Sequence, residues 1–126
     1  MNIPDNLKFT KDHEWVKVDG KTGTVGVTDY AQGELGDVIY IDIPSHDAEV
    51  KQGDSFGTIE AVKTVSDIFA PVSGKIVEVN TSINDNPASV NKDPYGDGWI
   101  VKIELSDPNE LNNLLTAKAY KELVGA

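Results

Sequence analysis

The sequence predicts a mainly β domain built as a sandwich or a small barrel. Apolar and polar residues alternate over short runs, β-branched residues are enriched in these runs, and Gly, Asp, Asn or Pro separates one run from the next. Strands this short and this regularly punctuated favour packed antiparallel sheets over a parallel sheet. With 126 residues and 39% hydrophobic content, the chain has the length of one domain, so we expect a single unit over residues 1–126.

Seven strands are expected along the chain. Their approximate ranges are 15–18, 22–28, 37–43, 55–62, 65–70, 75–80 and 99–105. The last run shows the alternation most clearly, because every second residue is apolar. Its predicted buried face consists of Trp99, Val101, Ile103 and Leu105.

One short helix is expected between the second and third strands. Thr28 or Asp29 can cap its start, and the helix would continue through residues 30–35. Gly36 can end it, because glycine adopts a left-handed conformation at little cost. The two segments around Asn86-Pro87 and Asp93-Pro94 are interpreted as loop turns.

A second helix is expected at the C-terminus, over about residues 108–123. Asp107 can serve as its cap, Pro108 suits the first helical position, and Glu110 adds an acidic residue to the first turn. The segment also has an apolar stripe, which we expect to pack on the sheet. The stripe consists of Leu111, Leu114, Leu115 and Leu123.

Composition argues against several functions. The 21 acidic residues outnumber the 11 basic ones, all of which are Lys, and the formal net charge is −10. Nucleic-acid and anionic-membrane partners are therefore not expected, because both require clustered cationic groups. The chain has no Cys, which excludes disulfides and Cys-ligated metals, and His13 and His46 are isolated from other ligands at metal-like spacing. We interpret His13 as structural or partner-facing.

The location expected from the sequence is the cytoplasm of a bacterial cell. Residues 1–9 lack the apolar core of a signal peptide and the Arg-rich character of a transit peptide. No run approaches the roughly 18 apolar residues that a membrane helix requires.

Lys63 lies between two alternating runs, residues 56–62 and 64–69, so a tight turn would place its amine at a hairpin tip. From this pattern alone, a solubilising turn lysine is the simpler interpretation. The alternative is a site of covalent attachment. A primary amine on a four-carbon stem can be acylated and then serves as a flexible tether, which a rigid hairpin presents to other enzymes.

The residues around Lys63 read EAVKTVSD at 60–67 and APVSG at 70–74, and they resemble the lipoyl-attachment segment of glycine cleavage H proteins. The resemblance spans about residues 7–121. Its other motifs, in matching order and spacing, are HEWV at 13–16, GVTDYAQ at 26–32, LGD at 35–37 and NKDPYGDGW at 91–99. Family members commonly have Ser where this chain has Ala61, a small-for-small change that is not expected to block lipoylation.

The resemblance implies a lipoyl-type barrel-sandwich hybrid with a core at about residues 22–105. An N-terminal β extension, one short internal helix and a C-terminal amphipathic helix would complete the fold. It also implies a non-catalytic, monomeric carrier with (R)-lipoate joined to Lys63. A pyridoxal-phosphate-dependent glycine decarboxylase would load an aminomethyl group, an aminomethyltransferase would pass its carbon to tetrahydrofolate, and dihydrolipoyl dehydrogenase would reoxidise the carrier. A lipoate-attaching enzyme would be the fourth partner.

The resemblance further implies that Glu14 and Asp67 lie near the loaded arm. The aminomethyl adduct carries an ammonium group that a carboxylate can hold. Surface carboxylates without this role remain the alternative, since the chain has 21 acids. Asp12 is a third candidate, although other members often have a small hydroxyl residue there. Glu60 is a candidate for recognition by the modifying enzyme.

Four other functions are alternatives to this one. A biotinyl carrier places Met on both sides of its lysine, whereas Val62 and Thr64 flank Lys63. The lipoyl domain of a 2-oxoacid dehydrogenase acyltransferase usually has Asp before the lysine and belongs to a longer chain. A free-standing enzyme is disfavoured by the lack of Cys, paired His and a Gly-rich phosphate loop. A relay of lipoyl or octanoyl groups to other lipoyl proteins is not separable by sequence and stays open.

Overall fold

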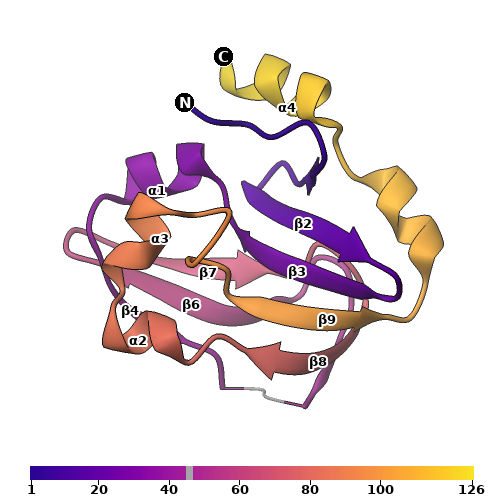
Figure 1. The fold of residues 1–126 in the computed structure, drawn as a ribbon, viewed down its shortest axis with the longest axis horizontal. Coiled ribbons are helices and arrows are strands. Elements are labelled where there is room, and N and C mark those ends of the chain that lie inside the picture. Colours follow the sequence, from indigo (N-terminus) through magenta and orange to yellow (C-terminus); the bar gives the residue numbers. More distant parts are fainter. Residues whose placement is uncertain (45–46) are drawn as a thin grey trace.

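The computed structural model describes residues 1–44 and 47–126, and within them the strands form two antiparallel sheets. In Figure 1 the smaller sheet lies behind the larger one. The larger sheet has the strand order β1 (Lys8–Phe9), β2 (Glu14–Asp19), β3 (Thr22–Val27), β9 (Val101–Leu105), β8 (Gly74–Val79) and β5 (Glu49–Val50). The smaller sheet has the order β4 (Val38–Asp42), β6 (Ser55–Ala61) and β7 (Val65–Phe69).

The main core fills the space between the two sheets. Its fully buried aliphatic residues come from alternate positions of the strands, which is why the alternating sequence pattern predicts them. Burying one such side chain contributes about 1.5–3 kcal/mol. Members from both sheets include Val25, Ile41, Ile59, Ile68, Ile76 and Ile103.

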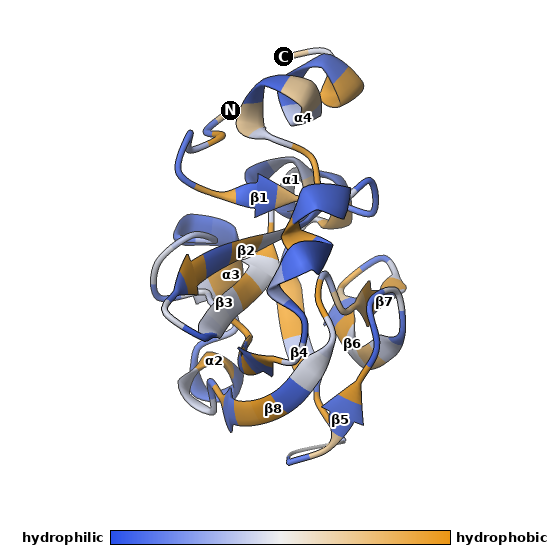
Figure 2. Cartoon of the chain, turned by 90° about the vertical axis from the view of Figure 1, so that its right-hand side faces the viewer, coloured by the Kyte–Doolittle hydropathy of each residue, from blue (hydrophilic) through white to orange (hydrophobic). Residues whose placement is uncertain are grey.

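A second cluster joins the two ends of the chain. Figure 2 shows the N-terminal segment beside α4 (Ala117–Val124) at one end of the molecule. Phe9 stacks on Tyr120 of α4 with ring centroids 4.7 Å apart. Trp15 of β2 belongs to the same cluster, and its indole nitrogen donates to the carbonyls of Val27 (3.1 Å) and Pro94 (3.0 Å). The indole lies against Gly26, where an added Cβ would stand only 2.7 Å from Nε1.

Three short helices cover the end of the molecule near β4. The predicted helix is α1 (Asp29–Leu35), capped by Thr28, whose Oγ1 accepts from the Ala31 amide at 3.1 Å. The other two, α2 (Ser82–Asp85) and α3 (Ala88–Lys92), were not predicted, and the expected turn at Asn86-Pro87 lies between them. They are single turns of helix that bury Ile83 and Val90 in the main core. Tertiary burial therefore decides their conformation, because segments this short have little helical preference of their own.

The expected helix over residues 108–123 is divided in two, so the prediction of one continuous helix is wrong. Pro108–Asn113 form a 3-10 helix, capped as expected by Asp107, and α4 begins only at Ala117. Between them Leu115 exchanges two backbone hydrogen bonds with Phe9, at 2.9 and 2.7 Å, which helical backbone could not form. Thr116 then caps α4.

The predicted apolar stripe is only partly correct. Leu111 and Leu114 pack against the main core and Leu115 against the second cluster. Leu123 is 53% exposed, contrary to the prediction, because α4 starts at a new phase after the break. The buried residues of α4 are instead Ala117 and Tyr120.

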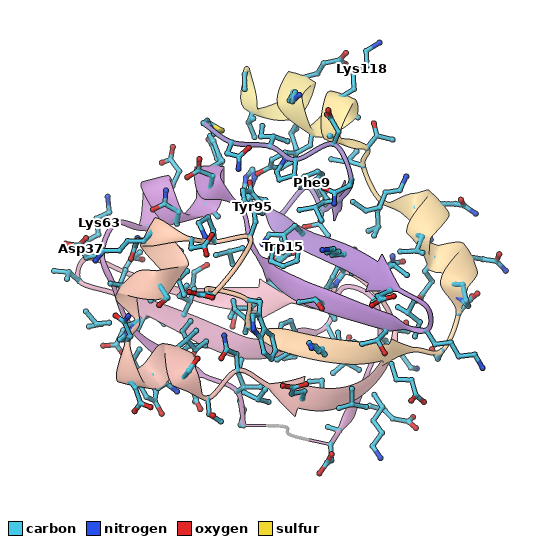
Figure 3. The ribbon with its side chains drawn as sticks, in the orientation of Figure 1. Phe9, Trp15, Asp37, Lys63, Tyr95 and Lys118 are labelled. Atoms are coloured by element: carbon cyan, nitrogen blue, oxygen red, sulfur yellow. The ribbon has the colours of Figure 1, made fainter. Side chains whose placement is uncertain are left out.

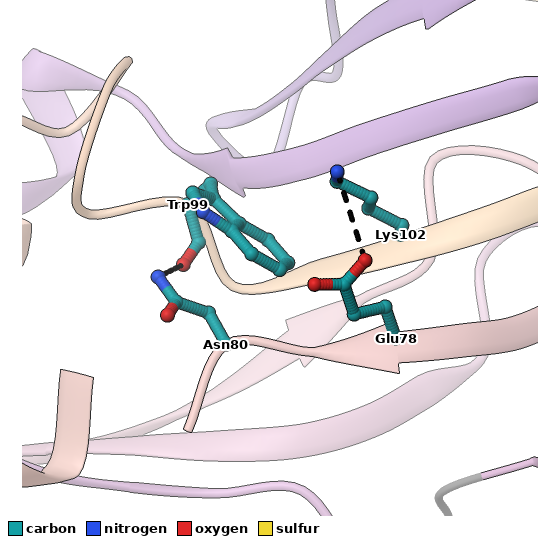
Figure 4. Close-up of polar contacts among 4 residues, drawn as sticks. All are labelled: Glu78, Asn80, Trp99 and Lys102. Carbon is teal, nitrogen blue, oxygen red and sulfur yellow. Dashed lines mark hydrogen bonds and ion pairs between the residues drawn. The ribbon is translucent and has the colours of Figure 1, made fainter. Parts of the chain in front are cut away.

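All seven predicted strands are present, with small differences at their ends. Trp99 was predicted on the buried face of the last strand but is not part of it. β9 begins only at Val101, and the residue before it, Ile100, is buried instead of Trp99. The Trp99 carbonyl accepts from Asn80 Nδ2 at 2.7 Å, and Lys102 Nζ lies 5.2 Å from the centroid of the indole (Figure 4). Lys102 also pairs with Glu78 at 3.7 Å.

The strands β1 and β5 have two residues each, which is too short for an alternating pattern to predict them. β1 belongs to the N-terminal β extension that the family resemblance implies. In the part of the chain that the structure describes, every helix falls short of the length and apolar character needed to cross a membrane.

We predict that α4 is held by Tyr120 rather than by its exposed leucine. Tyr120→Ala should lower the free energy of unfolding by about 3–5 kcal/mol, because it removes a fully buried aromatic ring. Leu123→Ala on the same helix is the matched control and should change it by less than about 0.5 kcal/mol. Urea unfolding measures both, and equal effects of the two substitutions would contradict the assignment.

Candidate functional site: an exposed lysine hairpin and a buried carboxyl

Lys63 lies at the tip of the hairpin that joins β6 to β7. Glu60 and Val65 form the last register pair, and the Ala61 amide donates to the Thr64 carbonyl at 2.8 Å to close the turn. Lys63 is exposed, as are its neighbours Val62 (74%) and Val65 (60%). The tip therefore presents a primary amine with apolar surface on both sides of it.

The backbone before β4 supports this tip. The Val62 amide donates to the Asp37 carbonyl at 3.0 Å, so the turn is tied to a second segment of chain. Figure 3 shows Lys63 and Asp37 together at one end of the molecule. A Cβ atom on Gly36 would stand 3.4 Å from Lys63 Cε, so the lysine stem lies across this glycine. Gly36 has a φ of 81°, a left-handed conformation that favours glycine.

Glu14 lies at the start of β2 and is only 2% exposed. Its Oε1 accepts from the Thr10 hydroxyl at 2.7 Å, and its Oε2 accepts from the Phe69 amide of β7 at 3.5 Å. Burial nevertheless dominates and raises the pKa of the Glu14 carboxyl to about 8. The group is thus largely protonated at neutral pH, unlike a surface carboxylate.

A cavity of about 360 Å³ lies beside Glu14, between the N-terminal extension and the end of β7. Its apolar lining includes Phe69 and Leu114, and Asp12 and Lys11 add charged groups. The volume lies within the range of small-ligand sites, which combine a mostly apolar lining with a few polar groups, as this cavity does.

Asp67 stands apart from this cavity. It is exposed on β7, where its Oδ1 accepts from the Ser55 hydroxyl at 3.2 Å. Glu14 contacts β7 at the Phe69 amide, two residues after Asp67 in the sequence. The N-terminal extension and β7 therefore meet beside Glu14, but Asp67, which was expected near the same loaded arm, lies outside the lining of this cavity.

The remaining residues singled out from the sequence are Glu60, His13 and His46. Glu60 is half-buried on β6, in register with Tyr40 of β4 and Val65 of β7. His13 Nδ1 lies 2.9 Å from the Tyr120 hydroxyl, a structural contact, and burial lowers the pKa of the imidazole. His46 lies outside the described residues. Among those described, the acidic and His side chains form no group of three that could hold a metal ion.

Sequence reasoning missed three residues of this region. Thr10 donates to Glu14, Gly36 supports the Lys63 stem, and Asn91 of α3 contacts the backbone on both sides of Asp37. Thr10 had a local signal, because it precedes Glu14 by four residues and a hydroxyl can cap a turn. Asn91 belongs to the NKDPYGDGW motif, but nothing local indicates its role, since these contacts lie more than 50 residues away.

Two antiparallel sheets with a lysine at the tip of a hairpin match the architecture of lipoyl-type carriers, and the fold is the lipoyl-type barrel-sandwich hybrid that the family resemblance implies. The chain belongs to the glycine cleavage H-protein family, whose pattern matches residues 7–126.

Relatives and a solved structure agree with this assignment. The chain is 54% identical over 125 residues to the glycine cleavage system H protein of Staphylococcus haemolyticus, with 99% of each chain covered. It is 51% identical, with the same coverage, to that of Staphylococcus saprophyticus. The crystal structure of a glycine cleavage system H protein from Mycobacterium marinum superposes with a TM-score of 0.90 at 40% identity, covering 98% of this chain and 100% of that one.

We predict a pH dependence of stability that originates at Glu14. Its pKa is raised from 4.5 in the unfolded chain to about 8 in the fold, so the folded state keeps a proton that the unfolded chain releases in between. The stability from this group is complete below pH 4.5 and is lost as pH rises towards 8. Glu14→Gln removes the titration.

Urea unfolding at pH 5 and at pH 8 measures the difference. At each pH the free energy of unfolding of the Glu14→Gln protein is subtracted from that of the parent. This difference should fall by on the order of 3 kcal/mol from pH 5 to pH 8. A difference between the proteins that stays constant across this range would contradict the raised pKa.

Proposed function

We propose that this protein carries (R)-lipoate in amide linkage on Lys63 and shuttles an aminomethyl group in glycine cleavage. Glycine decarboxylase would load the carrier, the tetrahydrofolate-dependent aminomethyltransferase would unload it, and dihydrolipoyl dehydrogenase would reoxidise it. The observation that carries the proposal is the exposed Lys63 amine at the hairpin tip of an H-protein family member.

The surroundings of Lys63 fit an acyl group. The amine is reachable from solvent. Within residues 1–44 and 47–126 the lysine ion pairs are those of Lys102 and Lys121, and acylation of Lys63 breaks neither. Val62 and Val65 offer exposed apolar surface to an enzyme that docks on the tip. When bound, the lipoyl group supplies a disulfide that takes up the aminomethyl group and is later regenerated.

The role of the hairpin is to act as a rigid base for a flexible tether. Ala61, Thr64 and the Val62–Asp37 hydrogen bond fix the turn, so the motion is confined to the lysine side chain and what it bears. A tethered group reaches each docked enzyme at a high effective concentration, and the steps do not depend on free diffusion. The chain itself catalyses none of them.

For the loaded state, we assign Glu14 as the partner of the ammonium group. A buried acid that holds its proton in the free protein can release it when a cation enters, and the resulting charge-assisted hydrogen bond is strong. Asp67 is the weaker candidate, since an exposed ion pair contributes less than about 1 kcal/mol. Glu60, three residues before Lys63, is proposed as a contact for the lipoate-attaching enzyme.

The partners are proposed to dock through basic surfaces. The net charge of −10 favours association with cationic patches and increases the rate of encounter. Monomeric state and a bacterial cytoplasmic location stay predictions.

We predict that Lys63→Arg abolishes lipoylation and glycine-dependent activity while the fold is retained. Arg keeps the positive charge but cannot replace the acylated amine. Lys118→Arg is the matched control, since Lys118 is also exposed but lies on α4, far from the hairpin (Figure 3). Intact mass after incubation with lipoate and a lipoate-attaching enzyme reports the modification, and carbon dioxide release from glycine in the reconstituted system reports activity.

Mass gain in Lys63→Arg, or a lipoylated peptide that contains any of the other ten lysines, would refute the assignment. Full glycine-dependent activity of the Lys63→Arg protein would do the same. The Lys118→Arg protein should match the parent in both measurements.

We predict that Glu14→Gln shortens the lifetime of the loaded carrier about tenfold, because a hydrogen bond to a charged group contributes about 1.5–3 kcal/mol. Asp67→Asn should change the lifetime less, and the double variant should resemble Glu14→Gln. Mass spectrometry of the isolated loaded protein follows the decay. Equal decay in the parent and the double variant would exclude a protective role for both carboxyl groups.

A further inference from the structure

The side chain of Asn91, on α3, bridges the backbone on both sides of Asp37. Its Oδ1 accepts from the Val38 amide at 2.9 Å, and its Nδ2 donates to the Gly36 carbonyl at 2.8 Å. A backbone donor and a backbone acceptor together fix which way the amide faces. Nδ2 also donates to Gln32 Oε1 at 3.1 Å, and the fully buried Val90 next to Asn91 anchors the helix.

The bridged segment is the one that contacts the lysine turn. Its middle residue, Asp37, accepts from the Val62 amide through its carbonyl, and its first residue, Gly36, lies under the Lys63 stem. The segment also contains a left-handed residue and precedes an irregular register between Val38 and Tyr40. Residues 36–37 lie outside the register pairs of β4, so the Asn91 amide adds two of the few hydrogen bonds that fix this segment, besides the Gly36 amide on the Gln32 carbonyl and the Val62 amide on the Asp37 carbonyl.

We infer that Asn91 is a positioning residue for Lys63, acting through the Gly36–Val38 backbone. This inference rests on the proposed function, in which Lys63 is the residue that becomes acylated. With the bridge intact, the turn is already in one conformation when the modifying enzyme docks. Without it, docking has to order the turn, and that cost appears as weaker binding of the protein substrate with little change in the chemical step.

The fold provides a matched control in Asn84, on α2. Its Oδ1 accepts from the Ile41 amide and its Nδ2 donates to the Ile41 carbonyl, both at 3.0 Å. Asn84 thus accepts from one backbone amide and donates to one backbone carbonyl, as Asn91 does, and both of its bonds are to β4. Ile41, however, lies in register with Ile59 in the interior of the β4–β6 pairing, away from the Val62–Asp37 bond.

The test compares Asn91→Ala with Asn84→Ala in the full chain. Hydrogen exchange of the Val62 amide reports whether the turn is held, and steady-state lipoylation of the unmodified protein by a lipoate-attaching enzyme gives KM and kcat. Asn91→Ala should speed Val62 exchange about tenfold and raise KM about tenfold with kcat within about twofold. Asn84→Ala should leave both near the parent values, although its urea midpoint falls.

Asn91→Asp is the second variant, for use if Asn91→Ala unfolds. It is nearly isosteric and keeps the acceptor towards Val38, but it places an anionic oxygen against the Gly36 carbonyl, so it should show the same rise in KM. Equal Val62 exchange in the Asn91 and Asn84 variants, or a KM unchanged from the parent, would overturn the inference. If the parent itself accepts no lipoate, the proposed function fails, while the Val62 exchange rates still decide whether Asn91 holds the turn.

Discussion

Burial of Ile59 and Ile68 between the two sheets is the constraint on which the site depends. Because successive strand residues point to opposite faces, burying these two side chains fixes the register of β6 against β7. A slip of one residue would bring Glu60 and Asp67 into the core. The register thus forces the three residues between the strands out beyond the core, and Lys63 is the middle one.

The buried Glu14 depends on both ends of the chain. The turn from Thr10 to Glu14 contains His13 in a left-handed conformation, φ 72°, which is uncommon for a residue other than glycine. The Tyr120 hydroxyl contacts His13 Nδ1 at 2.9 Å and Thr28 Oγ1 at 2.7 Å, and the Tyr120 ring stacks on Phe9. The C-terminal helix therefore helps to hold the turn that presents Glu14 to its cavity.

The free edge of β4 is covered by two short helices, α2 and α3. An edge strand has unpaired amides and carbonyls that would otherwise be open to pairing with another chain. Asn84 and Asn91 satisfy part of this edge with side-chain amides, which imitate the donor and acceptor of a neighbouring backbone. Ile83 and Val90, buried beside them, fix the two helices in place. The same helices thereby cover a sheet edge and approach the base of the lysine turn.

The sequence by itself determined the local features, because their causes are local. Alternation predicts the strands, the Thr28 hydroxyl and Gly36 predict α1, and the turn between two alternating runs places Lys63 at a hairpin tip. The resemblance in ordered motifs predicts the family. Each structural signal, and each motif of the resemblance, is carried by residues that are neighbours along the chain.

Tertiary structure alone decided the rest, because the contacts involved join distant segments. The C-terminal helix is broken where Leu115 pairs with Phe9, although Asp107 and Pro108 begin a helical segment as predicted. Glu14 becomes buried and Asp67 stays exposed, a difference that two acidic residues in a sequence of 21 acids cannot reveal. Asn91 meets residues 36 and 38 only after the sheets have packed, since no periodic pattern encodes a side-chain amide that reaches a backbone more than 50 residues away.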